Sequence, residues 1–406
     1  MKNDSRRDFL KKSLIGISGA ALVPGMLNKT NAGTGTLYPS NGYLLYRPLG
    51  KTGLKVPVIS MGVEGANSAG IIKAAYEGGI RMFFSATYYG EGNNEKLLGV
   101  AVKDLPRDTL IIGSAVIPNG VDHSGGTYTG ESTYEAQMKT AEDSLKRFGL
   151  EYLDFMLLPF AGKREGVFFE PLLRAMEDLK KQGKTRFVGI ATHSFQAEAI
   201  KAAADTKIYD VVMPAYNFQD ENLQETNDAI AYAVNAGVGI IGMKAQSGAY
   251  WDKEQTQPIN SDAALKWVLQ NENVTTVVSG MTNFNELEKN IALMKNELKP
   301  TEQELKDLRL ASNDGPSELW CKQCRQCTIQ CTKNLDIPTI MRSYMYAYGY
   351  HNLQKARATL DEASLSGLSC TDCSTCNIQC TAGFDVRRKI TDISRLLEVP
   401  NDFLRT

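Results

Sequence analysis

The sequence contains no cysteine before Cys321, and all eight cysteines fall into two short blocks near the C-terminus. Neither sign of charge dominates, because the formal net charge is −1. That balance gives no reason to expect a nucleic-acid partner or an anionic membrane surface. With 43% hydrophobic and 22% charged residues, the composition is that of an ordinary globular protein, long enough for one large domain and one small one.

The N-terminal segment lacks an apolar run long enough to cross a membrane. Its run "SLIGISGAALV" holds eleven residues and ends at Pro24. A spanning helix needs about 20, so no permanent membrane anchor is expected. The basic stretch "SRRDFLKK" precedes this run, and small residues around Ala32 follow it. This order of segments is typical of an export signal.

The pair Arg6–Arg7, followed by Phe9 and Leu10, resembles the twin-arginine signal, whose pathway exports folded proteins. We therefore predict that residues 1–32 are an export signal read by the twin-arginine translocase. The mature protein is then expected in the periplasm or elsewhere outside the cytoplasm. A disordered basic tail is the alternative.

A glycine-rich dinucleotide fingerprint is also missing, because "MGVEGAN" after the first apolar run does not match it. Eight short apolar runs alternate with longer amphipathic segments, at residues 56–62, 81–86, 109–115, 153–160, 186–192, 211–217, 239–245 and 275–281. Bulky apolar residues without strict alternation are typical of parallel strands buried on both faces. We predict an α/β fold in which residues 45–312 form a (β/α)₈ TIM barrel.

The cysteines occur in two blocks with the same spacing, C-x₂-C-x₂-C-x₃-C, within a predicted small helical, ferredoxin-like domain at residues 313–406. In two-cluster ferredoxins the fourth cysteine of each block binds the other cluster. One 4Fe-4S cluster is therefore assigned to Cys321, Cys324, Cys327 and Cys380, and a second to Cys370, Cys373, Cys376 and Cys331. Four disulfides or zinc sites are the alternatives, but neither explains the repeated fourfold spacing. The proline that usually follows the fourth cysteine is absent, with Thr332 and Thr381 in its place.

The stretches "YRPLGKTGLKVPVISMG", "GIRMFFSATYYG" and "YDVVMPAYNF" together resemble the aldo/keto reductases, in particular the branch with a C-terminal ferredoxin-like domain. That resemblance implies a barrel enzyme that reduces carbonyls with NADPH. It also implies a tetrad of tyrosine, aspartate, lysine and histidine, of which only the tyrosine has a match, at Tyr89. The aspartate position holds Phe84, the lysine position Ala115 and the histidine position Pro159.

The positions that the resemblance assigns to the nicotinamide are altered too, so NADP(H) is doubtful as a cofactor. A serine–asparagine pair is replaced by Ala191–Thr192, and a glutamine by Met213. Glu286 and Asn290 remain compatible with adenine-facing positions, although such residues are common on exposed helices. A phenol titrates near 10 and is a poor acid without a nearby cation, so Tyr89 is expected to bind a substrate rather than to transfer a proton. A packing role for Tyr89 is the alternative.

Other polar residues follow predicted strand ends, where barrel enzymes place their active sites. They are Glu64, His193, Asn217, Lys244 and Gln246. His193 could act near neutral pH, and Lys244 could bind substrate, the alternatives being a solvated loop histidine and a structural lysine.

Three functions follow. The first is an exported iron–sulfur oxidoreductase that passes electrons between an unidentified small molecule at the barrel mouth and a periplasmic redox partner. The second is a conventional NADP(H)-dependent carbonyl reductase. The third is a non-catalytic binding or assembly module with structural clusters.

Overall fold

The structure is a computed structural model that describes residues 44–117, 119–123, 125–309, 317–363, 365, 370, 373 and 376–404. The predicted export signal and the predicted domain boundary at residues 312 and 313 lie outside these ranges. Within them, no helix is long and apolar enough to cross a membrane.

Eight parallel strands close into a barrel, which confirms the predicted (β/α)₈ fold. In barrel order they are β10 (Val211–Pro214), β11 (Gly239–Gly242), β12 (Thr276–Gly280), β3 (Ile59–Gly62), β4 (Met82–Ala86), β5 (Ile111–Ala115), β8 (Leu153–Pro159) and β9 (Thr185–Thr192). The predicted first strand is divided, because β2 (Lys55–Pro57) instead pairs antiparallel with β1 (Tyr46–Pro48). Pro57 has no backbone N–H to continue a ladder, and the barrel strand starts at Ile59.

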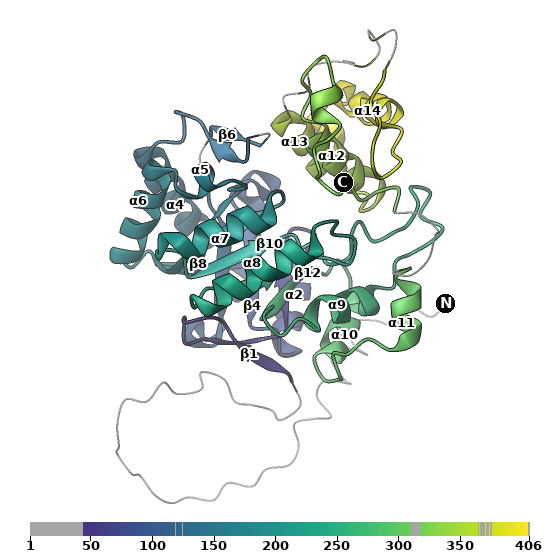
Figure 1. Cartoon of the computed structure of the whole chain (residues 1–406). Helices are drawn as coiled ribbons and strands as arrows, with labels where there is room; N and C mark the ends of the chain where they lie inside the picture. The colour runs from purple at the N-terminus through teal and green to yellow at the C-terminus, as the bar shows by residue number, and fades with distance from the viewer. Residues whose placement is uncertain are drawn as a thin grey trace, which may run out of the picture.

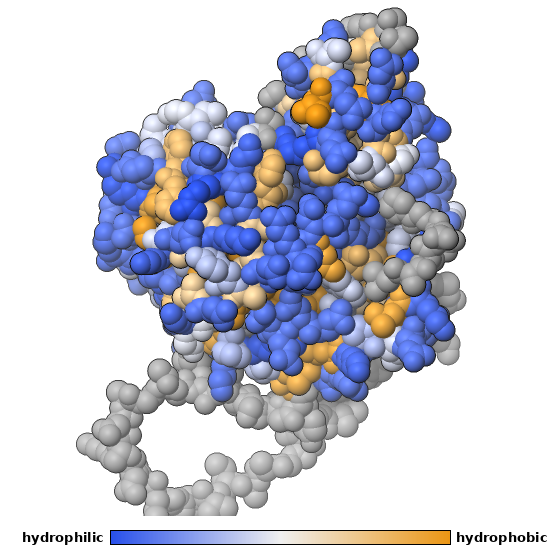
Figure 2. Space-filling model, viewed as in Figure 1, coloured by the Kyte–Doolittle hydropathy of each residue, from blue (hydrophilic) through white to orange (hydrophobic). Residues whose placement is uncertain are grey.

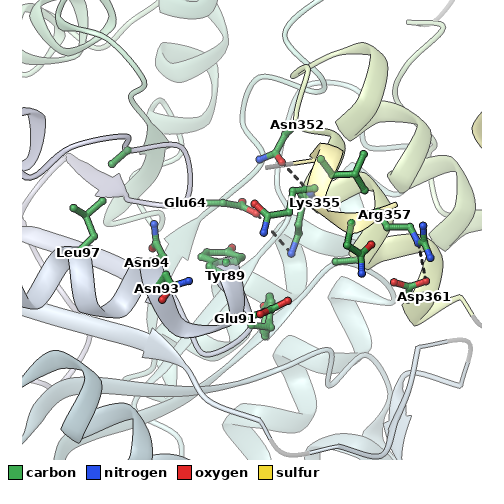
Figure 3. A pocket seen from close by; sticks show the side chains of 17 residues that line it. Glu64, Tyr89, Glu91, Asn93, Asn94, Leu97, Asn352, Lys355, Arg357 and Asp361 are labelled. Carbon is green, nitrogen blue, oxygen red and sulfur yellow. Dashed lines mark hydrogen bonds and ion pairs between the residues drawn. The ribbon is translucent and has the colours of Figure 1, made fainter. Parts of the chain in front are cut away.

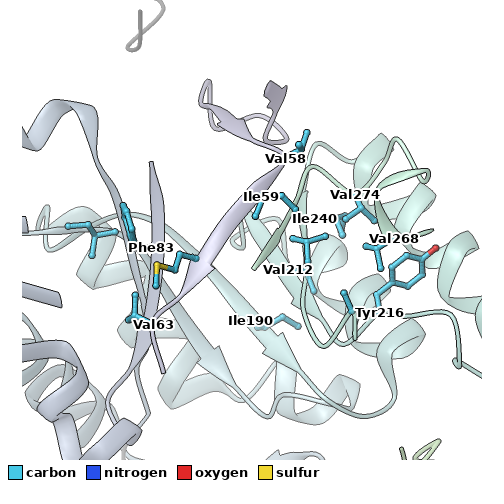
Figure 4. Close-up of a cluster of buried hydrophobic side chains, with 14 of the residues drawn as sticks. Val58, Ile59, Val63, Phe83, Ile190, Val212, Tyr216, Ile240, Val268 and Val274 are labelled. Carbon is cyan, nitrogen blue, oxygen red and sulfur yellow. The ribbon is translucent and has the colours of Figure 1, made fainter. Parts of the chain in front are cut away.

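Helices surround the barrel, and all of them except the last, which has no buried residue, bury apolar side chains against it (Figure 1). They are α2 (Ala69–Glu77), α3 (Asn93–Val102), α4 (Tyr134–Phe148), α5 (Arg164–Val167), α6 (Glu170–Lys181), α7 (Gln196–Thr206), α8 (Leu223–Asn235), α9 (Ser261–Leu269), α10 (Phe284–Leu293) and α11 (Glu302–Asp307). Figure 4 shows part of this core, where Val212 and Ile240 face Val268 and Val274. Thr301 and Glu304 form a capping box at the start of α11, as their spacing predicts.

The C-terminal residues form a separate packing unit around α12 (Ile337–Tyr348), α13 (Leu353–Glu362) and α14 (Val386–Ser394). This unit, here called the C-terminal domain, has its own apolar core and lies above one end of the barrel in Figure 1. In Figure 2 hydrophilic side chains cover most of the visible face of both units. The covered end is the one where β3, β4, β9 and β11 finish, because the residues that contact the C-terminal domain follow these strands.

Candidate functional site

Loops at the carboxyl ends of the barrel strands bring most of the predicted rim residues together beneath the C-terminal domain. Glu64 follows β3, Tyr89 starts the 3₁₀ turn η1 (Tyr89–Gly92) after β4, His193 follows β9 and Lys244 follows β11. The carboxyl ends of parallel strands lie on one rim of a barrel, which is why residues distant in sequence meet here.

Asn217 and Gln246 lie on the same rim, but their side chains form hydrogen bonds with neighbouring residues of the barrel. Asn217 Oδ1 accepts a hydrogen bond from the backbone N–H of Gln219 at 2.9 Å. Gln246 Nε2 donates to Ser261 Oγ at 2.6 Å. These two side chains therefore support the loops, and they line neither of the two cavities described below.

A cavity of about 320 Å³ lies between the barrel rim and the C-terminal domain. The barrel contributes Glu64, Tyr88 and Tyr89, and α13 contributes Lys355 and Arg357. Figure 3 shows Glu64 and Tyr89 facing Lys355 across the domain boundary, with Glu64 directed at Lys355. A site of this size suits a small molecule, since such sites range from about 300 to 1,000 Å³.

Lys355 provides a cation beside Tyr89. Its Nζ lies 4.6 and 4.7 Å from the ring centroids of Tyr88 and Tyr89, and 3.7 Å from Glu64 Oε1. Only 11% of its side chain is exposed, so the cation–π contacts are partly shielded from water and correspondingly stronger. The barrel positions of the sequence offered no cation near Tyr89, whereas the structure places Lys355 beside its ring. The cation comes from another domain, where no alignment of barrel positions could find it.

Tyr89 nevertheless remains a weak acid. Burial raises the pKa of its phenol well above the usual value, and the Glu64 carboxylate raises it further. Both effects penalise the phenolate. Tyr89 therefore stays protonated at physiological pH and is suited to hydrogen bonding with a ligand, as the sequence suggested.

A second, much smaller cavity connects the barrel to the cysteine region. It is lined by His193, Ala215, Lys244, Trp320, Cys321, Gln323, Arg342 and Met345. Lys244 Nζ donates a hydrogen bond to Tyr346 Oη at 2.7 Å, and the Tyr346 ring lies 5.7 Å from Lys355 Nζ. Tyr346 therefore stands between the large cavity and the small one.

His193 does not change charge near neutral pH as its residue type suggested. Burial lowers the pKa of its imidazole well below the usual value, and the positive charges of Arg342 and Lys244 lower it further. Its Nδ1 is buried without a hydrogen-bond partner among the described residues. His193 is thus a neutral imidazole beside Cys321, rather than a solvated loop histidine.

The structure brings the cysteines into the two predicted groups. Cys321, Cys324, Cys327 and Cys380 line one cavity, and Cys370 is surrounded by Cys331, Cys373 and Cys376. All eight are free thiols.

The chemistry of each group fits a bound cation. The pKa of Cys321 is raised to about 12, chiefly by burial, with smaller contributions from the neighbouring Cys327 and Cys380. Four thiolates so placed repel one another unless iron compensates their charge. The donor sets therefore fit 4Fe-4S clusters, each of which gains or loses one electron when bound.

Comparisons with known proteins agree with this division of the chain. Residues 61–262 match the aldo/keto reductase family, and residues 320–385 match the 4Fe-4S dicluster domain. The chain contains an aldo/keto reductase domain joined to a 4Fe-4S dicluster domain.

Curated relatives and solved structures extend this similarity over the barrel. L-galactose dehydrogenase from Arabidopsis thaliana is 26% identical over 61% of this chain and 86% of its own length. L-glyceraldehyde 3-phosphate reductase from Escherichia coli O157:H7 is 25% identical over 69% of this chain and 95% of its own. The holo form of an aldo-keto reductase from Bacillus halodurans shares the fold, with a TM-score of 0.55 and 19% identity, and covers 69% of this chain and 99% of its own.

The aldo/keto reductase domain packs apolar side chains where the family's tetrad is expected. Phe84 is 5% exposed and lies 6.1 Å from Phe155, centroid to centroid. Its ring fills space left by Gly113, because a Cβ added there would meet Phe84 Cε1 at 2.3 Å. Ala115 is buried at the end of β5. Apolar packing in the barrel core therefore occupies the two positions at which the family has its aspartate and its lysine.

The two residues that the resemblance assigns to the adenine of NADP(H) make hydrogen bonds within their own segment. Glu286 Oε2 accepts hydrogen bonds from Thr282 N at 2.7 Å and Thr282 Oγ1 at 3.0 Å, so its carboxylate is used within its own loop. Asn290 is buried and donates to the Glu286 carbonyl at 2.8 Å. A carboxylate folded over the start of α10 disfavours a 2′-phosphate. Asn290 Oδ1 is buried without a hydrogen-bond partner among the described residues, so the adenine-facing role of these two residues stays a prediction.

The dicluster domain supplies the site residues that the sequence analysis missed. They are Arg342, Tyr346, Lys355 and Arg357. The tyrosine-rich stretch "RSYMYAYGYHN" between the cysteine blocks was the available signal. It forms most of α12, whose contact with Lys244 follows only from the docking of the two domains.

Proposed function

We propose that this protein is an exported iron–sulfur oxidoreductase that passes electrons between a small molecule at the barrel mouth and a redox partner outside the cytoplasm. The observation that carries the proposal is the shared small cavity, in which barrel residues His193 and Lys244 lie beside the cluster ligand Cys321. The dicluster domain docks on the functional rim of the barrel, and this places one cysteine group next to that rim.

The large cavity supports the same proposal. Tyr346 contacts Lys244 directly and faces Lys355 across 5.7 Å. Packed residues of the two domains therefore join the large cavity to the Cys321 group. No separate linker or mobile segment is needed between them.

The altered nicotinamide positions favour a non-nicotinamide electron path. Ala191 and Met213, which replace polar residues at the nicotinamide positions, line the apolar barrel interior. Export, if the N-terminal segment acts as predicted, would remove the protein from the cytoplasmic nicotinamide pool. The two features point to the same function independently.

The proposal is tested by anaerobic redox titration of cluster-loaded mature protein. Small alcohols, aldehydes and sugars are added singly, and cluster reduction or oxidation is followed by absorbance and electron paramagnetic resonance. At least one compound is expected to change cluster redox state in wild type, while Cys324→Ser loses the response of the Cys321 group. A protein whose clusters respond to no compound contradicts the proposal and favours a non-catalytic binding module.

A further inference from the structure

The two cysteine blocks repeat at a fixed offset of 49 residues, so each position in one block has a counterpart in the other. Gln330 and Gln379 occupy matching positions, one residue before the fourth cysteine of each block. The backbone N–H of Gln379 donates to Gln330 Oε1 at 2.8 Å, and Gln330 Nε2 donates to the Gln379 carbonyl oxygen at 3.3 Å. The blocks therefore meet at equivalent points, and the repeat predicts matching surroundings for the two cysteine groups.

The threonines that follow the fourth cysteines break this equivalence. Thr381 Oγ1 lies 3.4 Å from Cys324 Sγ, within hydrogen-bond distance for sulfur, and Thr381 lines the cavity that contains the Cys321 group. The counterpart contact would join Thr332 to Cys373, but Thr332 Oγ1 makes no hydrogen bond to any residue that the structure describes. Both threonines are exposed, so burial does not account for the difference.

The hydroxyl of Thr381 is the donor in this contact when iron is bound. A ligating cysteine is a thiolate without a proton, so Cys324 Sγ can only accept. The donor stabilises the sulfur more strongly after reduction, because the cluster then carries one more negative charge. Hydrogen bonds to the sulfurs are among the factors that set the reduction potential of iron–sulfur clusters.

We propose that Thr381 raises the reduction potential of the cluster held by the Cys321 group, and that Thr332 has no such effect on the other cluster. The hydroxyl stands where ferredoxin blocks usually have a proline, whose side chain has no donor. The affected cluster is the one next to the barrel rim, since Cys321 shares a cavity with His193 and Lys244. The hydrogen bond thus favours electrons at the barrel side of the dicluster domain. The inference rests on the proposed function for its biological meaning, but it concerns a potential that needs no substrate.

The test is an anaerobic redox titration of the cluster-loaded full chain with dithionite and mediator dyes, followed by electron paramagnetic resonance. Thr381→Val keeps the shape of the side chain and removes the hydroxyl. We expect the reduced-to-oxidised ratio of one cluster at a fixed potential to fall about threefold, a shift of about 28 mV for a one-electron couple. Thr381→Ser keeps a hydroxyl and should stay close to wild type. Thr332→Val is the matched control and should shift neither potential.

Cys324→Ser identifies the potential of the Cys321 group, because it changes or removes the signal of that cluster alone. If the two potentials coincide in wild type, Thr381→Val should separate them. The inference is overturned if Thr381→Val leaves both potentials unchanged, if Thr332→Val causes the same shift, or if the shifted potential is the one that Cys324→Ser leaves intact. A shift in Thr381→Val, in a protein whose clusters respond to no substrate, would support this inference and contradict the proposed electron transfer. A substrate response without that shift would do the reverse.

Discussion

Lys244 Nζ, at the end of β11, donates a 2.7 Å hydrogen bond to Tyr346 Oη on α12, across the boundary between the two domains. The ammonium also lies 4.5 Å from the Tyr346 ring centroid. Tyr346 is thus one of the residues that join the dicluster domain to the barrel rim, and its partner Lys244 lines the cavity that contains Cys321.

We predict that Lys244→Met and Tyr346→Phe are energetically coupled. Each removes the same charge-assisted hydrogen bond, which contributes about 1.5–3 kcal/mol, so the double substitution should cost less than the sum of the single ones by about 1–2 kcal/mol. Urea unfolding of cluster-loaded protein measures this. Tyr348→Phe on the same helix, whose hydroxyl makes no hydrogen bond among the described residues, is the control and should not couple to Lys244→Met.

Each predicted cluster takes its fourth cysteine from the other block, so substitutions in different blocks are expected to damage the same cluster. Cys380→Ser should damage the same cluster as Cys321→Ser, although 58 residues lie between them, because both line one cavity. Cys331→Ser should instead resemble Cys370→Ser. Iron content and electron paramagnetic resonance distinguish the two outcomes, and matching spectra for Cys331→Ser and Cys321→Ser would refute the crossed assignment.

Gly113 is expected to be sensitive to a single methyl group. Gly113→Ala places a Cβ 2.3 Å from Phe84 Cε1, and overpacking of this kind costs about 1–3 kcal/mol. Gly280→Ala, also in a barrel strand but with nothing within 4 Å of the added Cβ, is the matched control. Thermal unfolding should show a clear loss for the first variant and little change for the second. Equal effects would mean that Phe84 does not fill the position as described.

Tyr89 is predicted to stay protonated beyond pH 10. Burial raises the pKa of its phenol in the folded protein, so the folded state holds its proton at a pH where an unfolded tyrosine loses it near 10. This contribution to stability is complete below pH 10 and is lost as the pH rises through the folded-state pKa. Carbon-13 resonances of labelled tyrosines, assigned with Tyr89→Phe, should show no titration of Tyr89 below pH 10. Titration below that pH would show that Lys355 activates it as an acid.

The barrel could be predicted because each strand carries its own apolar run. The spacing C-x₂-C-x₂-C-x₃-C groups the first three thiols of each block, and the place of the fourth thiol with the other block followed from the two-cluster ferredoxin pattern. Strands β10 and β11 end at Pro214 and Gly242, before the ends predicted at residues 217 and 245. The remaining residues of these apolar runs belong to the loops on the barrel rim.

The interdomain site could not be predicted in the same way. Lys355 meets Glu64 and Tyr89 only after two separately packed units dock, and no periodicity or spacing within either unit encodes that contact. The lowered pKa of His193 could not be predicted for the same reason. It depends on burial and on the charges of Arg342 and Lys244, which belong to different domains.

The most direct test of the central claim is an anaerobic titration of cluster-loaded mature protein, first with NADPH and NADH and then with uncharged sugars, following binding and cluster redox state together. We predict no tight nicotinamide binding and no turnover, together with a change in cluster redox state on addition of at least one sugar that Cys324→Ser alters. Tight NADPH binding with steady oxidation would contradict the account and establish a conventional carbonyl reductase.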